Sequence, residues 1–225
     1  MDPEIQSVLK SFFQNYSLES FDKNQIIVKP KDYKIFFLTK GVVRMFSSSK
    51  KGRRSTKASS GSEGDEITLN IYKANSIFPM PLVFGLENKN SFSSLTKVQG
   101  YFAPKKDFER FVRKNPTIFL DLLKRIYQGL DGFFMIYEAL LFRDAYYRIL
   151  TQLIIYARRF GKEKEGLITF DWHLTHQQLA SQSGLARESV TREIKKLQDK
   201  GLIGYSGKKL FIYDLPKLEE ECFTS

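Results

Sequence analysis

The chain has 225 residues, of which 42% are hydrophobic, so it is long enough for two domains that each bury a core. Its net charge of +11 favours a polyanionic partner, although residues 146–225 contain only 13 Lys and Arg against 10 Asp and Glu. A single cysteine excludes a disulfide framework and an iron–sulfur cluster, and the lack of a signal-peptide core or of about 18 consecutive apolar residues predicts a cytoplasmic protein with no membrane partner.

The first hundred residues are dominated by short β-type runs. Residues Ile5 to Phe13 favour a short amphipathic helix that precedes them. Turn residues such as Lys29-Pro30 and Lys40-Gly41 separate the runs, a pattern typical of a sandwich or a small barrel. The clearest runs are Ile26–Val28, Ile35–Leu38, Val42–Phe46 and Ile67–Tyr72.

The segment from Ser47 to Glu66 interrupts these runs and is polar throughout. It contains no aromatic residue, so we interpret it as a flexible hairpin loop. A solvated loop without a defined partner is favoured over contact with DNA or an acidic partner. The cations that would make such a contact are Lys50, Lys51, Arg53, Arg54 and Lys57.

A long helix is predicted to follow Asn115-Pro116, after a shorter helical section that begins near Lys105. Apolar residues recur along it at alternating spacings of four and three, which is the seam of a two-stranded coiled coil and favours a homodimer. The alternative is that this stripe packs on its own domain. Gly129 and Gly132 lower the helix propensity but would permit close approach of a partner helix or of the barrel. The seam residues are Phe119, Leu123, Ile126, Leu130, Phe133, Tyr137 and Leu140.

A further helix is predicted from Asp144 to Phe160, with Gly161 as its stop. We interpret Lys162 to Gly166 as a charged link. Short strands are expected at Leu167–Phe170 and at Trp172–Leu174.

The pattern after Leu174 predicts a helix-turn-helix. Thr175 and Gln178 form a capping box at the start of one helix, and Ser183-Gly184 ends it. A second helix begins near Arg187 and is amphipathic. Its inward residues are Val190, Ile194 and Leu197, and its outer face carries Arg187, Glu188, Thr191, Arg192, Lys195 and Lys196.

A β-hairpin wing follows this second helix. Leu202–Tyr205 and Leu210–Tyr213 flank the turn Ser206–Lys209. Two helices joined by a glycine turn, the second basic on its outer face, predict a protein that places this helix in the major groove of DNA.

A barrel, a long helix and a C-terminal winged helix, in this order, resemble the Crp/Fnr family of cAMP receptor protein-like bacterial regulators. The stretch Arg187-Glu188-Ser189-Val190-Thr191-Arg192 is similar to the family's R-E-[ST]-V-x-R signature, and Tyr33–Phe46 is similar to its barrel hairpin. The resemblance implies an α+β chain. Residues 1–114 would be a cupin-like, cyclic-nucleotide-binding-type β-barrel, 115–143 a dimerisation helix and 144–225 a winged helix-turn-helix.

The resemblance places base contacts at Arg187, Glu188 and Arg192. This chemistry is plausible, because arginine donates two hydrogen bonds to guanine and glutamate accepts one from cytosine. For Arg192 the alternative is a phosphate contact or an ion pair with Glu188. Ala186 lacks the usual side-chain cap. Auxiliary or DNA-backbone contacts, with a merely solvated role as the alternative, are expected at Thr175, His176, Gln177, Ser189, Thr191, Lys195, Lys208 and Lys209.

The expected effector site departs from the family pattern. Cyclic-nucleotide-binding members hold the phosphate with a Gly-Glu turn and a nearby arginine. Here Ile77–Leu82 contains Pro79 and Pro81 instead, and Ser91–Thr96 offers no arginine. We therefore predict no cyclic-nucleotide binding, no cofactor and no metal, with another effector left open. His173 and His176 are interpreted as structural.

Together these features favour a homodimeric regulator that reads a palindromic double-stranded DNA, with RNA polymerase as a further partner. By resemblance, each half-site would contain a TGTGA-like element. The alternative is a winged-helix module that binds protein or RNA without specific DNA readout. An enzyme is disfavoured, because the sequence has no Ser/His/Asp or Cys/His arrangement, P-loop or dinucleotide motif.

Overall fold

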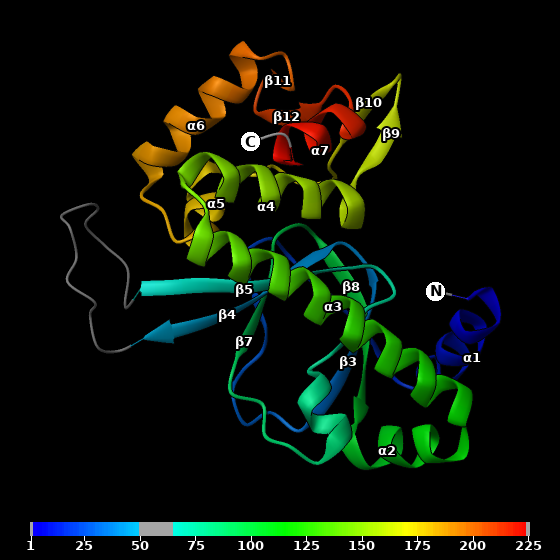
Figure 1. Ribbon diagram of the computed structural model, residues 1–225. Coiled ribbons are helices and arrows are strands. Elements are labelled where there is room, and N and C mark those ends of the chain that lie inside the picture. Colours follow the sequence, from blue (N-terminus) through cyan, green and yellow to red (C-terminus); the bar gives the residue numbers. More distant parts are fainter. Residues whose placement is uncertain (1, 50–64, 224–225) are drawn as a thin grey trace. The chain divides into compact units, whose positions relative to one another are not determined.

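The computed structural model describes residues 2–49 and 65–223 and divides the chain into two compact units, Met1–Ile126 and Tyr127–Ser225 (Figure 1). The division falls inside the long helix α3 (Pro116–Phe142). The five cations of the predicted basic loop, from Lys50 to Lys57, lie outside the described residues.

The N-terminal unit contains two four-stranded antiparallel sheets with strand orders β1-β8-β3-β6 and β2-β7-β4-β5. This confirms the predicted β-sheet domain, its short initial helix and the helical section that follows it. Its elements are α1 (Pro3–Phe13), β1 (Leu18–Phe21), β2 (Ile26–Val28), β3 (Lys34–Lys40), β4 (Val42–Ser49), β5 (Asp65–Lys73), β6 (Ile77–Phe78), the 3-10 helix η1 (Met80–Phe84), β7 (Ser91–Ser94), β8 (Val98–Pro104) and α2 (Lys105–Lys114).

Strand β3 is buried on both faces, which explains its unbroken apolar run. Ile35 and Phe37 belong to the core that the sheet shares with α1, α2 and the start of α3. Phe36 and Leu38, which alternate with them, belong to the core between the two sheets. Because successive side chains of a strand point to opposite faces, one strand contributes to both cores.

The first half of α3 packs on the N-terminal unit mainly through the face that carries Ile118 and Leu122, and Phe119 beside it contacts Phe84 edge-to-face. Ile118 and Leu122 are almost fully buried there. Arg125 donates from Nη1 to the backbone oxygen of Asn75 at 2.9 Å and is paired with Asp121.

Six of the seven predicted seam residues of α3 are exposed by 38% to 58% in the single chain, and Leu140 is half-buried. Packing on its own domain therefore leaves most of the stripe uncovered. The six are Phe119, Leu123, Ile126, Leu130, Phe133 and Tyr137.

The C-terminal unit combines helices with a third four-stranded sheet, of order β11-β12-β10-β9. After α3 its elements are α4 (Ala145–Phe160), β9 (Lys162–Lys164), β10 (Leu167–Thr169), α5 (His176–Ser183), α6 (Arg187–Asp199), β11 (Ile203–Ser206), β12 (Lys209–Ile212) and α7 (Leu215–Phe223).

Two local predictions in this unit were wrong. The charged link at Lys162 to Gly166 is instead the strand β9 and the turn of a β9–β10 hairpin. Trp172–Leu174 is not a strand. Trp172 and Leu174 are buried on either side of exposed His173, and Trp172 packs edge-to-face on Tyr156 and Phe160 of α4. Buried and exposed side chains alternate here as they do in a strand, but the backbone is not paired with another strand.

Gly161 follows α4 as predicted, but it does not adopt the left-handed conformation, since its φ is −59°. A Cβ at this position would lie 2.4 Å from the carbonyl oxygen of Ala157. The glycine is therefore required for close approach.

Gly100 of β8 offers a test of the packing around β3. A Cβ there would lie 2.4 Å from both the Phe37 carbonyl oxygen and the Phe36 ring. We expect Gly100→Ala to lower the free energy of unfolding by about 1–3 kcal/mol, measured by urea denaturation followed by circular dichroism. Gly132→Ala is the matched control, because a Cβ on this helical glycine meets nothing within 4 Å. It should be neutral or stabilise by up to about 1 kcal/mol, and equal losses in both variants would contradict this account.

Candidate DNA-binding surface

The helix-turn-helix forms as the sequence predicts. Thr175 Oγ1 accepts from the Gln178 backbone N–H at 3.1 Å, and Gln178 Oε1 accepts from the Thr175 backbone N–H at 3.1 Å. Gly184 ends α5 in the left-handed region, with a φ of 65°. Ala186 precedes α6 without a side-chain cap, as expected.

Helix α6 has one buried and one exposed face. Val190, Ile194 and Leu197 are at most 1% exposed. The predicted base-reading residues are exposed, Glu188 and Arg192 on the opposite face and Arg187 at the first position of the helix, and Ser189 is half-buried. Thr191 and Lys195 are also exposed, and Lys195 is paired with Asp199 at 2.8 Å.

An open cleft of about 320 Å³ lies between the N-terminus of α5, the start of α6 and the turn of the wing. It brings together five residues that were selected separately from the sequence, Thr175, His176, Gln177, Arg187 and Lys208. Backbone N–H groups at a helix N-terminus together with cations suit a phosphate. Lys209, at the other end of the wing turn, is exposed.

His176 connects three elements around this cleft. Its Nδ1 lies 2.9 Å from Thr191 Oγ1 on α6, and its Nε2 lies 3.2 Å from the Tyr205 hydroxyl on β11. Thr191 Oγ1 already donates to the Arg187 carbonyl, so Nδ1 of the histidine donates and Nε2 accepts. The side chains of His176 and Thr191 thus have partners inside the chain, a role that the sequence analysis did not foresee for Thr191.

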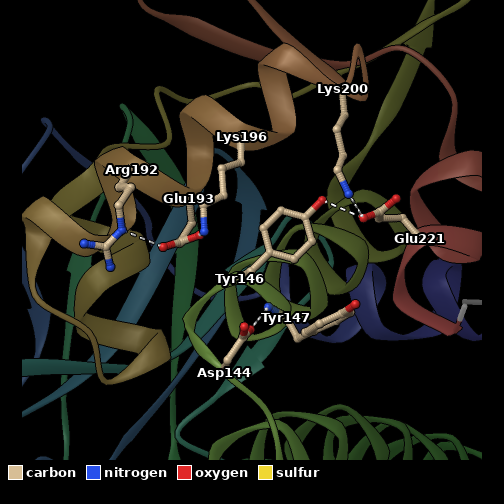
Figure 2. Close-up of polar contacts among 8 residues, drawn as sticks. All are labelled: Asp144, Tyr146, Tyr147, Arg192, Glu193, Lys196, Lys200 and Glu221. Atoms are coloured by element: carbon tan, nitrogen blue, oxygen red, sulfur yellow. Dashed lines mark hydrogen bonds and ion pairs between the residues drawn. The ribbon is translucent and has the colours of Figure 1, made fainter. Parts of the chain in front are cut away.

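Glu193, which was not predicted as a functional residue from the sequence, is the buried acid of α6 (Figure 2). Its side chain is 3% exposed and lies 2.9 Å from Arg192 Nε and 2.6 Å from Lys196 Nζ. Burial would raise the pKa of Glu193, but the hydrogen bonds and charges of Lys196 and Arg192 outweigh it and lower the pKa. Among the described residues, the ion-pair partner of Arg192 is Glu193 and not Glu188, so the predicted ion pair with Glu188 was wrong, while the phosphate contact stays a prediction.

A second cluster fixes the C-terminal end of α6 against α4 and α7. Tyr146 donates to Glu221 Oε1 at 2.8 Å, and Lys200 Nζ donates to the same oxygen at 2.5 Å (Figure 2). The hydrogen bond from Lys200 lowers the pKa of Glu221 more than burial raises it. Burial and the bond to Glu221 raise the pKa of Tyr146. The helix α7, which the sequence analysis did not predict, supplies this acid.

In the N-terminal unit, aromatic rings fill the space between the sheets. Phe78, inside the stretch that would correspond to the family's phosphate turn, is fully buried and stacks on Phe92 with ring centroids 4.7 Å apart. The strand Ser91–Ser94 does have an arginine partner, which the sequence analysis missed. Arg44 of β4 donates from Nε to Ser93 Oγ at 3.0 Å and is also paired with Glu66.

Over residues 2–49 and 65–223, no three His, Cys, Asp or Glu side chains are grouped as metal ligands. No helix within that same part of the chain is long and apolar enough to cross a membrane.

Comparison with known families defines the class of this surface. Residues 147–221 match the model of the Crp-like helix-turn-helix domain. The segment covers α5, α6 and the wing, so the cleft and the exposed face of α6 belong to a DNA-binding domain of this type.

The similarity extends along most of the chain. The global nitrogen regulator of Nostoc sp. is 29% identical over 201 residues, covering 87% of this chain and 85% of that protein. The global nitrogen regulator of Synechocystis sp. is 28% identical and covers 91% and 88%. Among solved structures, a CooA mutant from Carboxydothermus hydrogenoformans superposes with a TM-score of 0.75 at 20% identity, covering 100% of this chain and 97% of that one. A CRP/FNR-family transcriptional regulator from Thermus thermophilus, TTHA1359, gives 0.68 at 23%, covering 92% and 98%. The chain is a Crp/Fnr-type transcription regulator, which confirms the resemblance.

The histidine at the cleft predicts an effect of pH on stability. Burial lowers the pKa of His176, and the charges of Arg187 and His173 lower it further. As the pH falls through about 6.5, the unfolded chain therefore binds a proton before the folded chain does, and stability is lost. Thermal unfolding followed by the fluorescence of Trp172 should shift to lower temperature between about pH 7.5 and pH 5.5.

The only other histidine provides the control. His176→Gln should flatten this pH dependence, whereas His173→Gln, at an exposed position three residues away, should retain it. An unchanged slope in His176→Gln would show that this ring does not cause the effect.

Proposed function

We propose that the protein is a homodimeric, sequence-specific DNA-binding regulator that does not respond to cyclic nucleotides. The single observation that carries the proposal is the two-faced α6. Its apolar side is buried, while Arg187, Glu188 and Arg192 are exposed together near its N-terminal end. That end of a recognition helix enters the major groove.

The residues divide into two roles in this proposal. Arg187 and Arg192 would donate to guanine, and Glu188 would accept from cytosine. Thr175, Gln177 and Lys208, which line the cleft, would contact phosphates and fix the register without reading sequence. By analogy with the regulators it resembles, the protein would act in the cytoplasm together with RNA polymerase.

Binding to a library of inverted-repeat duplexes tests this division. Arg187→Ala should weaken binding to the selected operator by about 1–3 kcal/mol and relax the preference at one base position. Lys208→Ala should instead weaken binding to all sequences alike and reduce the slope of log K against log salt by about one. If the wild-type protein bound all duplexes equally, or preferred structured RNA, specific DNA readout would be ruled out.

The exposed stripe of α3 supports the dimer. Six seam residues recur at heptad spacing and stay uncovered in the single chain. The face that carries Ile118 and Leu122 is already packed, so the two faces do not compete. Pairing two copies would bury the stripe and could hold two recognition helices about 34 Å apart, one turn of DNA.

Sedimentation velocity tests the seam. Leu130→Glu, in the middle of the stripe, should convert the dimer to a monomer, because a carboxylate would be buried against an apolar partner. Gln128→Glu adds the same side chain at an exposed position off the seam of the same helix and should leave the dimer intact. A monomeric wild-type protein, or dissociation of both variants alike, would contradict the proposed interface.

The independence from cyclic nucleotides rests on the site that would hold the phosphate. Pro79 and Pro81 provide no N–H donor, and the guanidinium of Arg44 is already paired with Glu66. Buried rings of Phe36, Phe78 and Phe92 occupy the interior between the sheets. The effector, if the barrel has one, is of a different chemistry.

A further inference from the structure

Glu193 stands out as an ionised group on the buried face of a recognition helix. Its neighbours along that face are Val190, Ile194 and Leu197. A buried carboxylate is costly unless it is paired and hydrogen-bonded. Here Oε1 accepts from Arg192 and Oε2 lies against Lys196, so the two oxygens serve two different cations of the outer face.

The contact with Arg192 is unusual for its spacing. Adjacent residues of a helix do not face each other, because they are separated by about 100° around the axis. Arg192 nevertheless reaches back to Glu193 through Nε at 2.9 Å, while its side chain remains 65% exposed. Figure 2 shows the outer two nitrogens of its guanidinium pointing away from Glu193.

This geometry leaves the base-reading end of the guanidinium available. Bidentate recognition of guanine O6 and N7 needs two N–H groups on one edge of a planar fork. The bond at Nε occupies the inner part of the fork and restricts rotation of the plane. Within the described part of the chain, Arg192 Nη1 and Nη2 have no hydrogen-bond partner.

We propose that Glu193 is a positioning residue for sequence readout. It orients Arg192 before DNA binds and thereby determines the selectivity at the base pair that Arg192 reads. The proposal rests on the proposed function, since it requires α6 to read DNA. A side chain oriented in advance loses less conformational freedom on binding, so the correct base is favoured over the wrong one by a larger ratio.

Folding alone does not account for this acid. Replacing a buried ion pair by an apolar residue of similar size is often neutral or stabilising. A leucine at position 193 would continue the apolar face of Val190, Ile194 and Leu197. A role in positioning therefore predicts that the same substitution lowers selectivity without lowering stability.

The experiment uses the full-length protein and an operator selected from the inverted-repeat library. Arg192→Ala first identifies the base pair whose preference is lost. For that base pair, the ratio of the dissociation constants for altered and selected operators should fall roughly five- to tenfold in Glu193→Leu. Its thermal unfolding should be unchanged or shifted upward.

Three further variants separate positioning from charge. Glu193→Gln keeps an oxygen that can accept from Arg192 Nε, so it should retain most of the selectivity. In an Arg192→Ala background, Glu193→Leu should cause no additional loss at that base pair. Lys196→Met removes the other cation and should weaken binding to all DNA sequences alike.

The outcomes distinguish this inference from the proposed function. If the wild-type protein selects an operator but Glu193→Leu keeps the full ratio at that base pair, the positioning role is wrong and the proposed function stands. An equal loss in Glu193→Leu and Glu193→Gln would also overturn it, since loss of charge would then explain the effect. If the wild-type protein selects no operator, both are overturned.

Discussion

The proposed DNA-reading surface is the exposed side of α6, and its orientation depends on the burial of the other side of this helix. Val190, Ile194 and Leu197 are almost fully buried, and each such side chain contributes about 1.5–3 kcal/mol. Their spacing along the helix fixes the rotation of α6, and this rotation decides which residues face outward. The polar contacts act on a helix that is already oriented: His176 connects its start to α5 and the wing, and Glu221 of α7 holds Lys200 just beyond its end.

The sequence was sufficient to predict those features of the structure that local chemistry determines. The capping box at Thr175, the left-handed Gly184 and the apolar period of α6 each have a short-range cause, and all are observed. Prediction from the sequence failed where an alternating pattern of burial was taken for the backbone pairing of a strand. Trp172 and Leu174 alternate with His173 as strand residues would, yet they are buried by aromatic packing on α4. The strand β9 of the local β9–β10 hairpin is charged and exposed, so it has no apolar pattern to predict it. The docking of α7 depends on contacts between distant residues, which periodicity does not encode.

The candidate site also contains features that could be predicted from the sequence and features that could not. Exposure of Glu188 and Arg192 follows from their position opposite the apolar stripe, and Arg187 is exposed because it is the first residue of the helix, so both were predictable. The partner of Arg192 was not, because helix spacing points to Glu188, four residues earlier, and not to its immediate neighbour. One signal for Glu193 was present in the sequence. An acid three residues after Val190 and four before Leu197, flanked by Arg192 and Lys196, lies on the buried face with cations at both borders.

These pairings also explain how a weakly charged domain could recognise a polyanion. Glu193 and Asp199 partly neutralise the cations of α6, so the unit has little excess charge with which to bind DNA of any sequence. In the proposed function, this lowers non-specific affinity and retains the oriented donors that would read bases. A single unit of this kind binds weakly, and linking two units through a helix seam raises the affinity without new contacts. In the proposed dimer, the uncovered stripe of α3 and the partly neutralised face of α6 are therefore complementary: the first supplies affinity through pairing, and the second keeps that affinity for the correct sequence.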